Sequence, residues 1–351
     1  NVAVTVNHHE IESKKKEISP VFVITICGDK YERKNAIKDD VNRQIEQAYV
    51  LIKSAALLTK NKLRFFILVN DDSFYNTLLA KLNQWPEKIR LKFSLEKEKI
   101  WYPDTGNFME MFRLCATERL FLLKVLPSVD SVVYLDTDMI FLKPPEDLWE
   151  EFSKFDSFQI SGMAPCLFHY TPELKIPYYG KTGLIDELWM MNLTRMKTFP
   201  GGWIETCLEV YNEYRTSIRI ADQDIANIIF SKNPKFLYDL ECQWNYRDFT
   251  CYSGKNLCKE SGTNGIFLLH GNAFNFYSDK NQKFKILFRE FLHFDVNKPL
   301  EELIQTLKRS LKNINYKINK SKCAYLLNID KLLTKSLENT INGFPENKIS
   351  F

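Results

Sequence analysis

Residues 132–142 read Val-Val-Tyr-Leu-Asp-Thr-Asp-Met-Ile-Phe-Leu and give the clearest sign of a fold in the chain. The first four are two valines, a tyrosine and a leucine, a run that is typical of a strand buried on both faces of a parallel sheet. Asp136 and Asp138 follow directly, and alternate residues of an extended chain point to the same side. Their two carboxylates can therefore converge on one cation just beyond the end of the strand.

This pair of carboxylates leaves two interpretations open. An Asp-x-Asp pattern occurs about once by chance in a chain of this length, so both acids could simply solvate a strand end or cap a helix. The flanking apolar runs favour a metal site, since carboxylate oxygens bind magnesium, calcium or manganese. Such a metal could hold two phosphate oxygens of a nucleotide-sugar and neutralise charge as the diphosphate leaves.

Two similar apolar runs come earlier, at Val21–Cys27 and Arg64–Val69, and polar residues close each of them. Apolar residues at helical spacing lie between the runs, so strands and helices alternate through about the first 150 residues. This alternation predicts an α/β fold with a doubly wound sheet, in which ligands bind beyond the carboxyl ends of the strands. Gly28-Asp29, Asn70-Asp71 and the acidic pair would share that edge.

The remaining elements follow from the same patterns. We expect strands at Ile89–Phe93, Gln159–Ala164, Leu188–Asn192 and Gly265–Leu269, and helices at Phe108–Leu126, Ile204–Tyr214 and Asp224–Phe230. The chain then divides into a polar N-terminal tail (1–19), one α/β domain (20–295) and a basic helical C-terminal extension (296–351). In that extension Leu303, Leu307 and Leu311 lie near helical spacing.

Three further groups could take part in chemistry, and each has a structural alternative. A lone histidine such as His270 is more often structural, but an imidazole beside two carboxylates would favour manganese over magnesium. The run Asp222-Gln223-Asp224 could begin a helix, where acids offset the helix dipole, or could bind a sugar ring. Arg113 and Arg119 could be surface residues, or Arg119 could reach a diphosphate or hold Asp136 in place.

Composition narrows the class of protein. The 351 residues are 45% hydrophobic and 26% charged, which suits a packed domain. A formal net charge of +4 does not describe a nucleic-acid-binding protein, which needs a concentrated basic face. No stretch is long and apolar enough to span a bilayer. Because the chain starts at Asn1, a signal or anchor segment could precede it in a longer precursor.

The eight cysteines show no C-x-x-C spacing, so a zinc site is not expected. Cys27 and Cys115 lie in apolar segments and are predicted to be buried core thiols. Cys242, Cys251 and Cys258 crowd one polar loop, where a disulfide could form in an oxidising compartment.

Several segments together resemble glycosyltransferase family 8. They are Leu135–Pro144, Arg119-Leu120, Asp222–Asn227 and Leu269–Asn272. Within that family the chain is most similar to the animal glucoside xylosyltransferases, through Tyr178–Gly183, Met191–Met196 and Cys242–Arg247. The resemblance covers roughly residues 21–292, and these longer segments are more specific than Asp-x-Asp alone.

The resemblance implies a GT-A-type, Rossmann-like fold, with a mostly parallel sheet flanked by helices and a C-terminal helical extension. It implies a retaining, metal-dependent transfer of xylose from UDP-xylose. The implied acceptor is O-linked glucose on epidermal growth factor-like repeats of Notch-type glycoproteins, extended through an α1,3 linkage. It also implies a type II membrane protein of the endoplasmic reticulum or Golgi, of which this chain would be a luminal part without its anchor.

The resemblance also assigns roles to individual residues. It makes Asp136, Asp138 and His270 the ligands of a divalent metal, expected to be manganese. The residues implied to bind the nucleotide-sugar are Ile26, Cys27, Gly28, Asp29, Arg119, Thr137, Gly271 and Asn272. Asp222 and Gln223 would face the reacting side of the xylose as catalytic residues, without an obvious side-chain nucleophile. Trp244, Asn245 and Tyr246 are candidates for the acceptor side, although a buried aromatic cluster would explain Trp244 and Tyr246 equally well.

Three places depart from the family pattern. Ile185-Asp186-Glu187 stands where the family has Asn-Ser-Gly, in a loop expected to contact the donor sugar. Lys30–Arg43 is expected to be an insertion beside the uridine pocket, and Ala273-Phe274-Asn275 is less polar than the family pattern. Two carboxylates beside a diphosphate motivate two alternatives to an active xylosyltransferase. One is an inactive relative that binds metal and UDP or a glycoprotein, and the other is a transferase with a different UDP-sugar donor.

Overall fold

The computed structural model describes residues 19–28, 40–106, 108–111, 115–272, 274–314, 323, 326 and 328–343. Our predictions for the N-terminal tail before Ser19, for Asp29, for most of the Lys30–Arg43 segment, and for Arg113 and Ala273 fall outside these residues.

The centre of the described chain is a seven-stranded sheet in the order β3-β2-β1-β4-β7-β6-β8. Its strands are β1 (Val21–Ile26), β2 (Leu63–Val69), β3 (Phe93–Lys99), β4 (Val132–Leu135), β6 (Ser161–Pro165), β7 (Leu184–Met191) and β8 (Leu237–Asp239). Only β7 runs antiparallel to its neighbours, β4 and β6, and the other pairs are parallel. The predicted mostly parallel α/β sheet is therefore confirmed.

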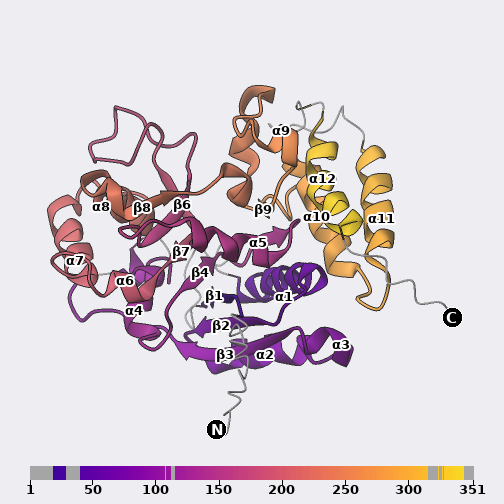
Figure 1. Ribbon diagram of the computed structural model, residues 1–351, viewed down its shortest axis with the longest axis horizontal. Helices are drawn as coiled ribbons and strands as arrows, with labels where there is room; N and C mark the ends of the chain where they lie inside the picture. The colour runs from indigo at the N-terminus through magenta and orange to yellow at the C-terminus, as the bar shows by residue number, and fades with distance from the viewer. Residues whose placement is uncertain are drawn as a thin grey trace, which may run out of the picture.

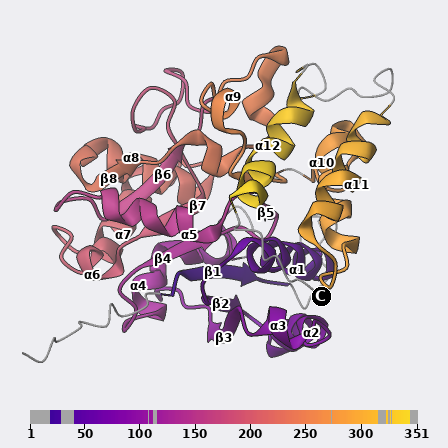
Figure 2. The ribbon, with the colours of Figure 1, turned by 45° about the vertical axis from the view of Figure 1, so that its right-hand side comes forward.

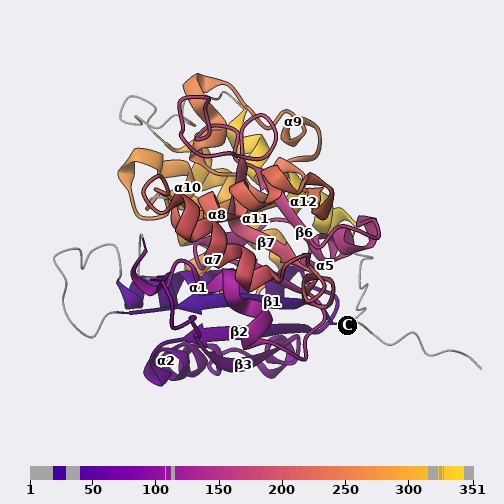
Figure 3. The same cartoon turned by 90° about the vertical axis from the view of Figure 1, so that its left-hand side faces the viewer.

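Both faces of the sheet are covered, which explains why its central strands are mostly apolar. On β1, Phe22, Ile24 and Ile26 belong to the apolar cluster that includes α1 (Val41–Leu58), whereas Val21 and Val23 belong to the cluster on the other face. That second cluster includes residues of α7 (Trp203–Tyr214) and α8 (Ala221–Lys232). Figure 1 shows α7 and α8 on one side of the molecule, and Figure 3 shows them in front of β6 and β7.

Two of the predicted elements are wrong. At 89–93 the chain forms the short helix α3 (Glu87–Arg90), and the strand starts only at Phe93, because β3 is an edge strand whose polar residues hide it in the sequence. The long helix expected at 108–126 is instead two 3-10 turns, Phe108–Glu110 and Glu118–Phe121, followed by α4 (Leu122–Val125). Cys115 lies between the turns with φ of 59°, a left-handed conformation that no α-helix can include.

The prediction of free thiols at Cys27 and Cys115 is also wrong, because the two form a disulfide. The left-handed turn at Cys115 brings this residue to the end of β1, although 88 positions separate the two cysteines. The polar loop contains the disulfide Cys242–Cys258, and Cys251 pairs with Cys323. Cys166 and Cys207 are free and buried.

A second, two-stranded sheet delivers the predicted site residues. It pairs β5 (Met139–Phe141) with β9 (Leu268–His270) in antiparallel register, with Met139 opposite His270. Asp136, Thr137 and Asp138 form the short link between β4 and β5. This pairing brings a histidine from far down the chain to the acidic pair.

Where we predicted a C-terminal helical extension, the structure has α11 (Leu300–Lys312) and α12 (Ile329–Asn342), which pack beside α10 (Gln282–His293). Figure 2 shows the three helices above α1. Leu303, Leu307 and Leu311 are buried on one face of α11, as their spacing indicated. The boundary between residues 295 and 296 stays a prediction.

The remaining helices are short or peripheral. They are α2 (Asp72–Leu82), α5 (Pro145–Glu150), α6 (Leu193–Met196) and α9 (Ser261–Asn264). Among the described residues, none of the helices combines the length and apolar character needed to cross a membrane.

Candidate active site and metal centre

The predicted site residues meet in one pocket of about 510 Å³ at the edge where β1 and β4 end and β7 begins. Side chains of β1, the β4–β5 link, β7, α8 and the segment after β9 line this pocket. Its lining includes Cys27, Arg119, Asp136, Thr137, Asp138, Asp186, Glu187, Asp222, Gln223, Arg247, His270 and Asn272. The pocket lies where a doubly wound sheet is expected to bind its ligand.

Asp136, Asp138 and His270 form the candidate metal centre. One ligand atom from each lies within 4.8 Å of the others, and His270 Nε2 lies 3.3 Å from Asp138 Oδ1. Two carboxylates and an imidazole are a donor set that fits a divalent transition metal. The backbone fixes this geometry, because the Gly271 amide donates a hydrogen bond of 2.7 Å to the Asp138 carbonyl.

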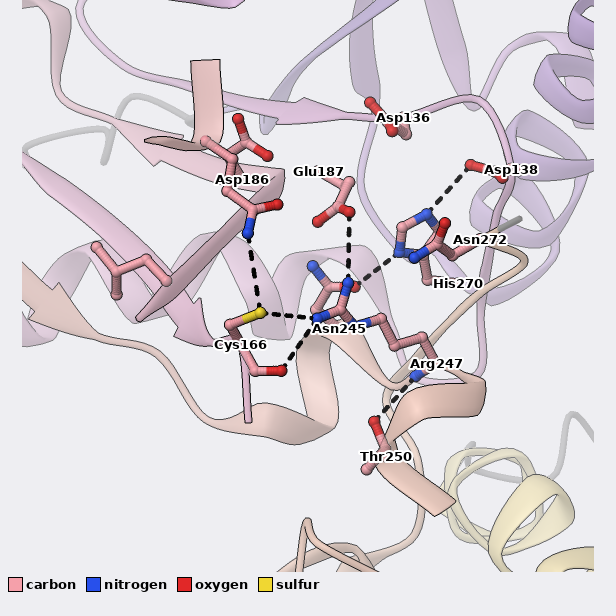
Figure 4. Close-up of polar contacts among 12 residues, drawn as sticks. Asp136, Asp138, Cys166, Asp186, Glu187, Asn245, Arg247, Thr250, His270 and Asn272 are labelled. Carbon is pink, nitrogen blue, oxygen red and sulfur yellow. Dashed lines mark hydrogen bonds and ion pairs between the residues drawn. The ribbon is translucent and has the colours of Figure 1, made fainter. Parts of the chain in front are cut away.

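Asn245 orients the imidazole of His270. Its side-chain oxygen lies 3.0 Å from His270 Nδ1, so that nitrogen donates its proton and Nε2 keeps a lone pair for a metal. Figure 4 shows His270 between Asn245 and Asp138. Asn245 was expected on the acceptor side, but in this structure its side chain supports the candidate metal centre.

The charges of His270 and Asp138 depend on each other. Burial by itself would lower the pKa of His270, but Asp138 outweighs burial and the net pKa is raised. Burial would likewise raise the pKa of Asp138, but His270 holds it below its usual value. The metal-free pair therefore favours an imidazolium beside a carboxylate, and a cation must displace that proton to bind.

We expect Asn245→Ala to weaken manganese binding about 10- to 100-fold, which is the usual effect of removing a group that orients a metal-bound histidine. Free manganese measured by electron paramagnetic resonance during a titration would give the affinity. Asn245→Asp keeps an oxygen acceptor opposite Nδ1 and should retain most of the binding. Equal affinity of Asn245→Ala and the unchanged protein would contradict the orienting role.

Arg119 is a buried cation that joins several parts of the pocket. Only 6% of the residue is exposed, and its guanidinium lies 4.2 Å from the centre of the Tyr134 ring. Nη2 donates to Asp136 Oδ1 at 2.9 Å, and Nη1 donates to the Asp186 carbonyl at 3.0 Å. Nε lies 2.9 Å from Asp222 Oδ2, close enough for an ion pair although the angle is poor for a hydrogen bond. Arg119 thus positions Asp136, as the sequence suggested.

Asp186 and Glu187 lie in strand β7, which corrects our expectation of a loop there. Asp186 and Asp222 are both buried next to Arg119, and two buried carboxyl groups close together favour keeping a proton on one of them. Burial and then Asp222 raise the pKa of Asp186 far above its usual value, so Asp186 is the protonated partner. Glu187 Oε1 lies 3.6 Å from Arg247 Nη1. Neither acid therefore adds an uncompensated charge.

Asp222 and Gln223 occupy the first turn of α8, facing the pocket. Burial raises the pKa of Asp222 to about 6, although Arg119 opposes this shift. Asp224 has the structural role instead, since it accepts from the backbone amides of Arg219 and Ile220 at the helix start. The helix-start interpretation of the 222–224 run therefore holds for Asp224, whereas sugar binding by Asp222 and Gln223 stays a prediction.

The residues predicted to bind the nucleotide differ in their exposure to the pocket. Cys27 lines it, and Gln44 fixes the Cys27 backbone through both its amide and its carbonyl. Asn70 fixes Gly28 in the same way. Ile26 is buried in the core and does not line the pocket.

The other predicted positions also have defined surroundings. Thr137 donates to Gln47, and Asn272 lines the pocket. Gly271 packs so closely on the Phe276 ring that a Cβ would lie 2.3 Å from it. The glycine is thus needed for packing, whatever ligand binds nearby.

Trp244 and Tyr246 cannot contact an acceptor in this structure. Both are fully buried in the apolar core, and the Tyr246 backbone bonds to β9 through Leu268 and His270. The prediction that placed these rings on the acceptor side is therefore wrong, and the buried-cluster alternative is correct.

Sequence reasoning missed several pocket residues. They are Arg43, Gln44, Gln47, Cys115, His169, Arg247 and Phe249. Gln44 and Gln47 could have been noticed, because they are polar and one turn apart on an otherwise apolar helix face. His169 and Phe249 come from segments without periodicity, so no local signal points to them.

Known proteins resemble the chain in sequence. Glucoside xylosyltransferase 1 of Mus musculus is 31% identical over 329 residues, which are 87% of this chain and 78% of that protein. Glucoside xylosyltransferase 2 of Mus musculus is 37% identical over 273 residues, which are 72% of this chain but only 60% of that protein. No protein-family model matches the chain.

Solved structures show the same fold. The galactosyltransferase LgtC, in complex with donor and acceptor sugar analogues, has a TM-score of 0.58 at 15% identity over 82% of this chain and 99% of that one. Mouse xyloside xylosyltransferase 1 in its apo form has a TM-score of 0.52 at 15% identity over 73% of this chain and 98% of that one. At such identities the likeness concerns the fold alone, and it confirms the predicted GT-A type.

Proposed function

This chain belongs to the glucoside xylosyltransferase family, and on that premise we propose that it transfers xylose from UDP-xylose to O-linked glucose on epidermal growth factor-like repeats. The transfer forms an α1,3 linkage with retention of anomeric configuration. The observation that supports this most strongly is the meeting of Asp136, Asp138 and His270 beside the buried pair Arg119–Asp222. A leaving diphosphate needs positive charge, and a donor sugar needs fixed polar groups.

The metal we propose is manganese, held by Asp136, Asp138 and His270, because imidazole prefers transition metals to magnesium. When bound, such an ion supplies positive charge to the diphosphate as UDP departs. The donor set points the same way, because one ligand atom each from Asp136, Asp138 and His270 lies within 4.8 Å of the others.

The residues of the chain then have distinct tasks. Arg119 holds Asp136 and Asp222 in fixed positions, and Cys27 lines the pocket on the nucleoside side. Asp222 and Gln223 face the donor sugar, where a carboxylate stabilises positive charge developing at the anomeric carbon. The acceptor hydroxyl attacks from the face that UDP leaves, so a carbon–oxygen bond forms as the bond to phosphate breaks. Its proton passes to the leaving phosphate.

The acidic Asp186-Glu187 pair supports an active enzyme better than an inactive relative. Asp186 is neutral because burial and then the neighbouring Asp222 raise its pKa far above its usual value, and Glu187 is matched by Arg247. The pair therefore does not repel a diphosphate as two free carboxylates would. A different donor stays the second candidate, because these side chains still change the shape of the sugar pocket.

We place the enzyme in the lumen of the secretory pathway, as a type II membrane protein in its full-length form. Three disulfides among the described residues support this, since disulfides persist in oxidising compartments.

One assay tests the proposal against both alternatives. The purified protein with manganese would receive UDP-xylose, UDP-glucose or UDP-galactose and an O-glucosylated repeat, with mass spectrometry of the product. Xylose transfer, absent with chelator or with an unglucosylated repeat, is the expected result. Transfer of another sugar would favour the second donor, and UDP binding without any transfer would favour the inactive relative.

A further inference from the structure

Arg43 lines the active-site pocket but has no task in the proposed mechanism. It lies in the first turn of α1, where Asp40 caps the helix by accepting from the amides of Asn42 and Arg43. The next residue, Gln44, bonds to both the amide and the carbonyl of Cys27, which follows β1. These contacts fix the start of α1, and with it the backbone of Arg43, beside the end of β1.

The Phe274 ring contacts the guanidinium of Arg43. Arg43 Cζ lies 4.1 Å from the ring centre, and both residues line the pocket. An aromatic face attracts a cation placed over it. Phe274 has φ of 68°, an uncommon backbone conformation for a residue other than glycine, of a kind that clusters at binding sites. The less polar segment after β9 therefore contributes a ring that holds a cation brought by α1.

Arg43 is also close to the candidate metal centre. Burial would raise the pKa of Asp138, but His270 and, more weakly, the positive charge of Arg43 lower it. Figure 4 shows Asn272, two residues before Phe274, beside His270. Arg43 is thus near both the end of β1 and the metal centre. A UDP with its nucleoside at the end of β1 and its phosphates at the metal has its diphosphate beside this arginine.

Two other arginines are among the described residues that line the pocket, and acids already engage both. Arg119 is paired with two carboxylates, and Arg247 faces a third. Both arginines are almost fully buried, whereas Arg43 is partly exposed. Of the three, Arg43 is therefore the cation best placed to meet an anion that enters the pocket.

We propose that Arg43 binds the diphosphate of the UDP-sugar donor and that Phe274 holds its guanidinium in place. This inference rests on the proposed function. A guanidinium has five N–H donors in a planar fork that matches phosphate oxygens, so it can bind a phosphate and keep contacts within the protein. Its charge stabilises the diphosphate as the bond to the sugar breaks and UDP departs.

Calorimetric titration with UDP tests the contact without turnover. Arg43→Gln removes the charge and should weaken manganese-dependent UDP binding about 10- to 100-fold, the usual effect of losing hydrogen bonds to a charged group. Arg215→Gln, at an exposed position that ends α7, is the matched control and should bind UDP as the unchanged protein does. Equal UDP affinity in Arg43→Gln and the unchanged protein would overturn the proposal.

Manganese binding without nucleotide separates this role from a purely structural one. Arg43 places a positive charge near the metal centre, so Arg43→Gln should leave the manganese affinity unchanged or tighten it. Free manganese measured by electron paramagnetic resonance would give that affinity. If Arg43 only kept Asp138 in place, the variant would bind manganese more weakly, and that result would overturn the proposal.

Titration with UDP-glucuronate distinguishes the diphosphate from a charged donor sugar as the ligand of Arg43. We expect Arg43→Gln to weaken binding of UDP and of UDP-glucuronate by similar factors, because both carry the diphosphate. A loss for UDP-glucuronate alone would place Arg43 at the sugar and would overturn the proposal.

A double-mutant cycle tests the ring. Phe274→Leu should weaken UDP binding about threefold, the contribution of a cation–ring contact at a partly exposed site. In the Arg43→Gln background the same change should have no effect, because the cation that the ring holds is gone. An equal effect in both backgrounds would show that the ring acts independently of Arg43 and would overturn its supporting role.

These binding measurements keep the inference apart from the proposed transfer. A loss of UDP affinity in Arg43→Gln would support the contact even if no xylose were transferred. Xylose transfer by a protein whose UDP affinity is indifferent to Arg43 would leave the proposed function standing and overturn this inference alone.

Discussion

Asp138→Ala is expected to weaken manganese-dependent UDP binding at least about a hundredfold and to abolish transfer. The variant would lose one of the three residues that would hold the metal, and the positive charge of such an ion would contribute several kcal/mol to binding a diphosphate. The fold should persist, because the link to β9 runs through the Asp138 backbone carbonyl and the Gly271 amide. Calorimetric titration of UDP, with manganese and with chelator, would measure the effect.

The matched control for this variant is Asp147→Ala. Asp147 is a partly exposed carboxylate that forms an i,i+4 ion pair with Lys143, outside the pocket. Asp147→Ala should leave metal-dependent UDP binding unchanged. Thermal unfolding in chelator would show whether Asp138→Ala is folded. If the folded variant bound UDP with unchanged metal dependence, Asp138 would not be a metal ligand.

The parts of the fold that could be predicted are those where burial alone dictates the sequence. β1, β2 and β4 are covered on both faces, so each is a nearly continuous apolar run, interrupted only by Thr25 in β1 and Arg64 in β2. β3 could not be found this way, because it is an edge strand and many of its residues are charged. The break at Cys115 depends on a backbone conformation and a distant disulfide, and neither leaves a local pattern.

The same distinction applies to the site. The edge rule for α/β sheets located Asp136 and Asp138 from sequence, and their convergence with His270 is seen in the structure. Their role as metal ligands stays a prediction. The partners Asn245 for His270 and Arg247 for Glu187 arise from packing of irregular segments, which sequence periodicity does not encode.

Arg119→Met is expected to lower the free energy of unfolding by about 3–5 kcal/mol at pH 7.5, the usual cost of removing one partner of a buried ion pair. The variant leaves the buried carboxylate of Asp222 and the partly buried carboxylate of Asp136 without their shared cation. It should also lose UDP binding, because Asp136 would no longer be held in place. Urea unfolding in chelator measures the stability without any contribution from metal.

The pH dependence of the free energy of unfolding distinguishes a charge effect of Arg119 from a packing effect. Asp222 has a folded pKa of about 6 against a usual value near 3.8, so its stabilising effect is present at low pH and is lost as pH rises through about 6. Arg119→Met removes the positive charge that lowers the pKa of Asp222, so the folded pKa of Asp222 should rise further. The stability deficit of Arg119→Met should therefore be largest at pH 7.5 and smaller at pH 5. An equal deficit at both pH values would contradict a charge effect.

A double variant tests whether the loss of stability comes from the unpaired carboxylate of Asp222. Arg119→Met with Asp222→Asn replaces one unpaired acid with a neutral amide, so it should be more stable than Arg119→Met alone at pH 7.5. Arg289→Met, at an exposed position of α10, should change stability little. If the double variant were no more stable than Arg119→Met, Arg119 would act chiefly through its packing on the Tyr134 ring. The loss of UDP binding should persist in the double variant, because Asp136 still lacks the cation that positions it.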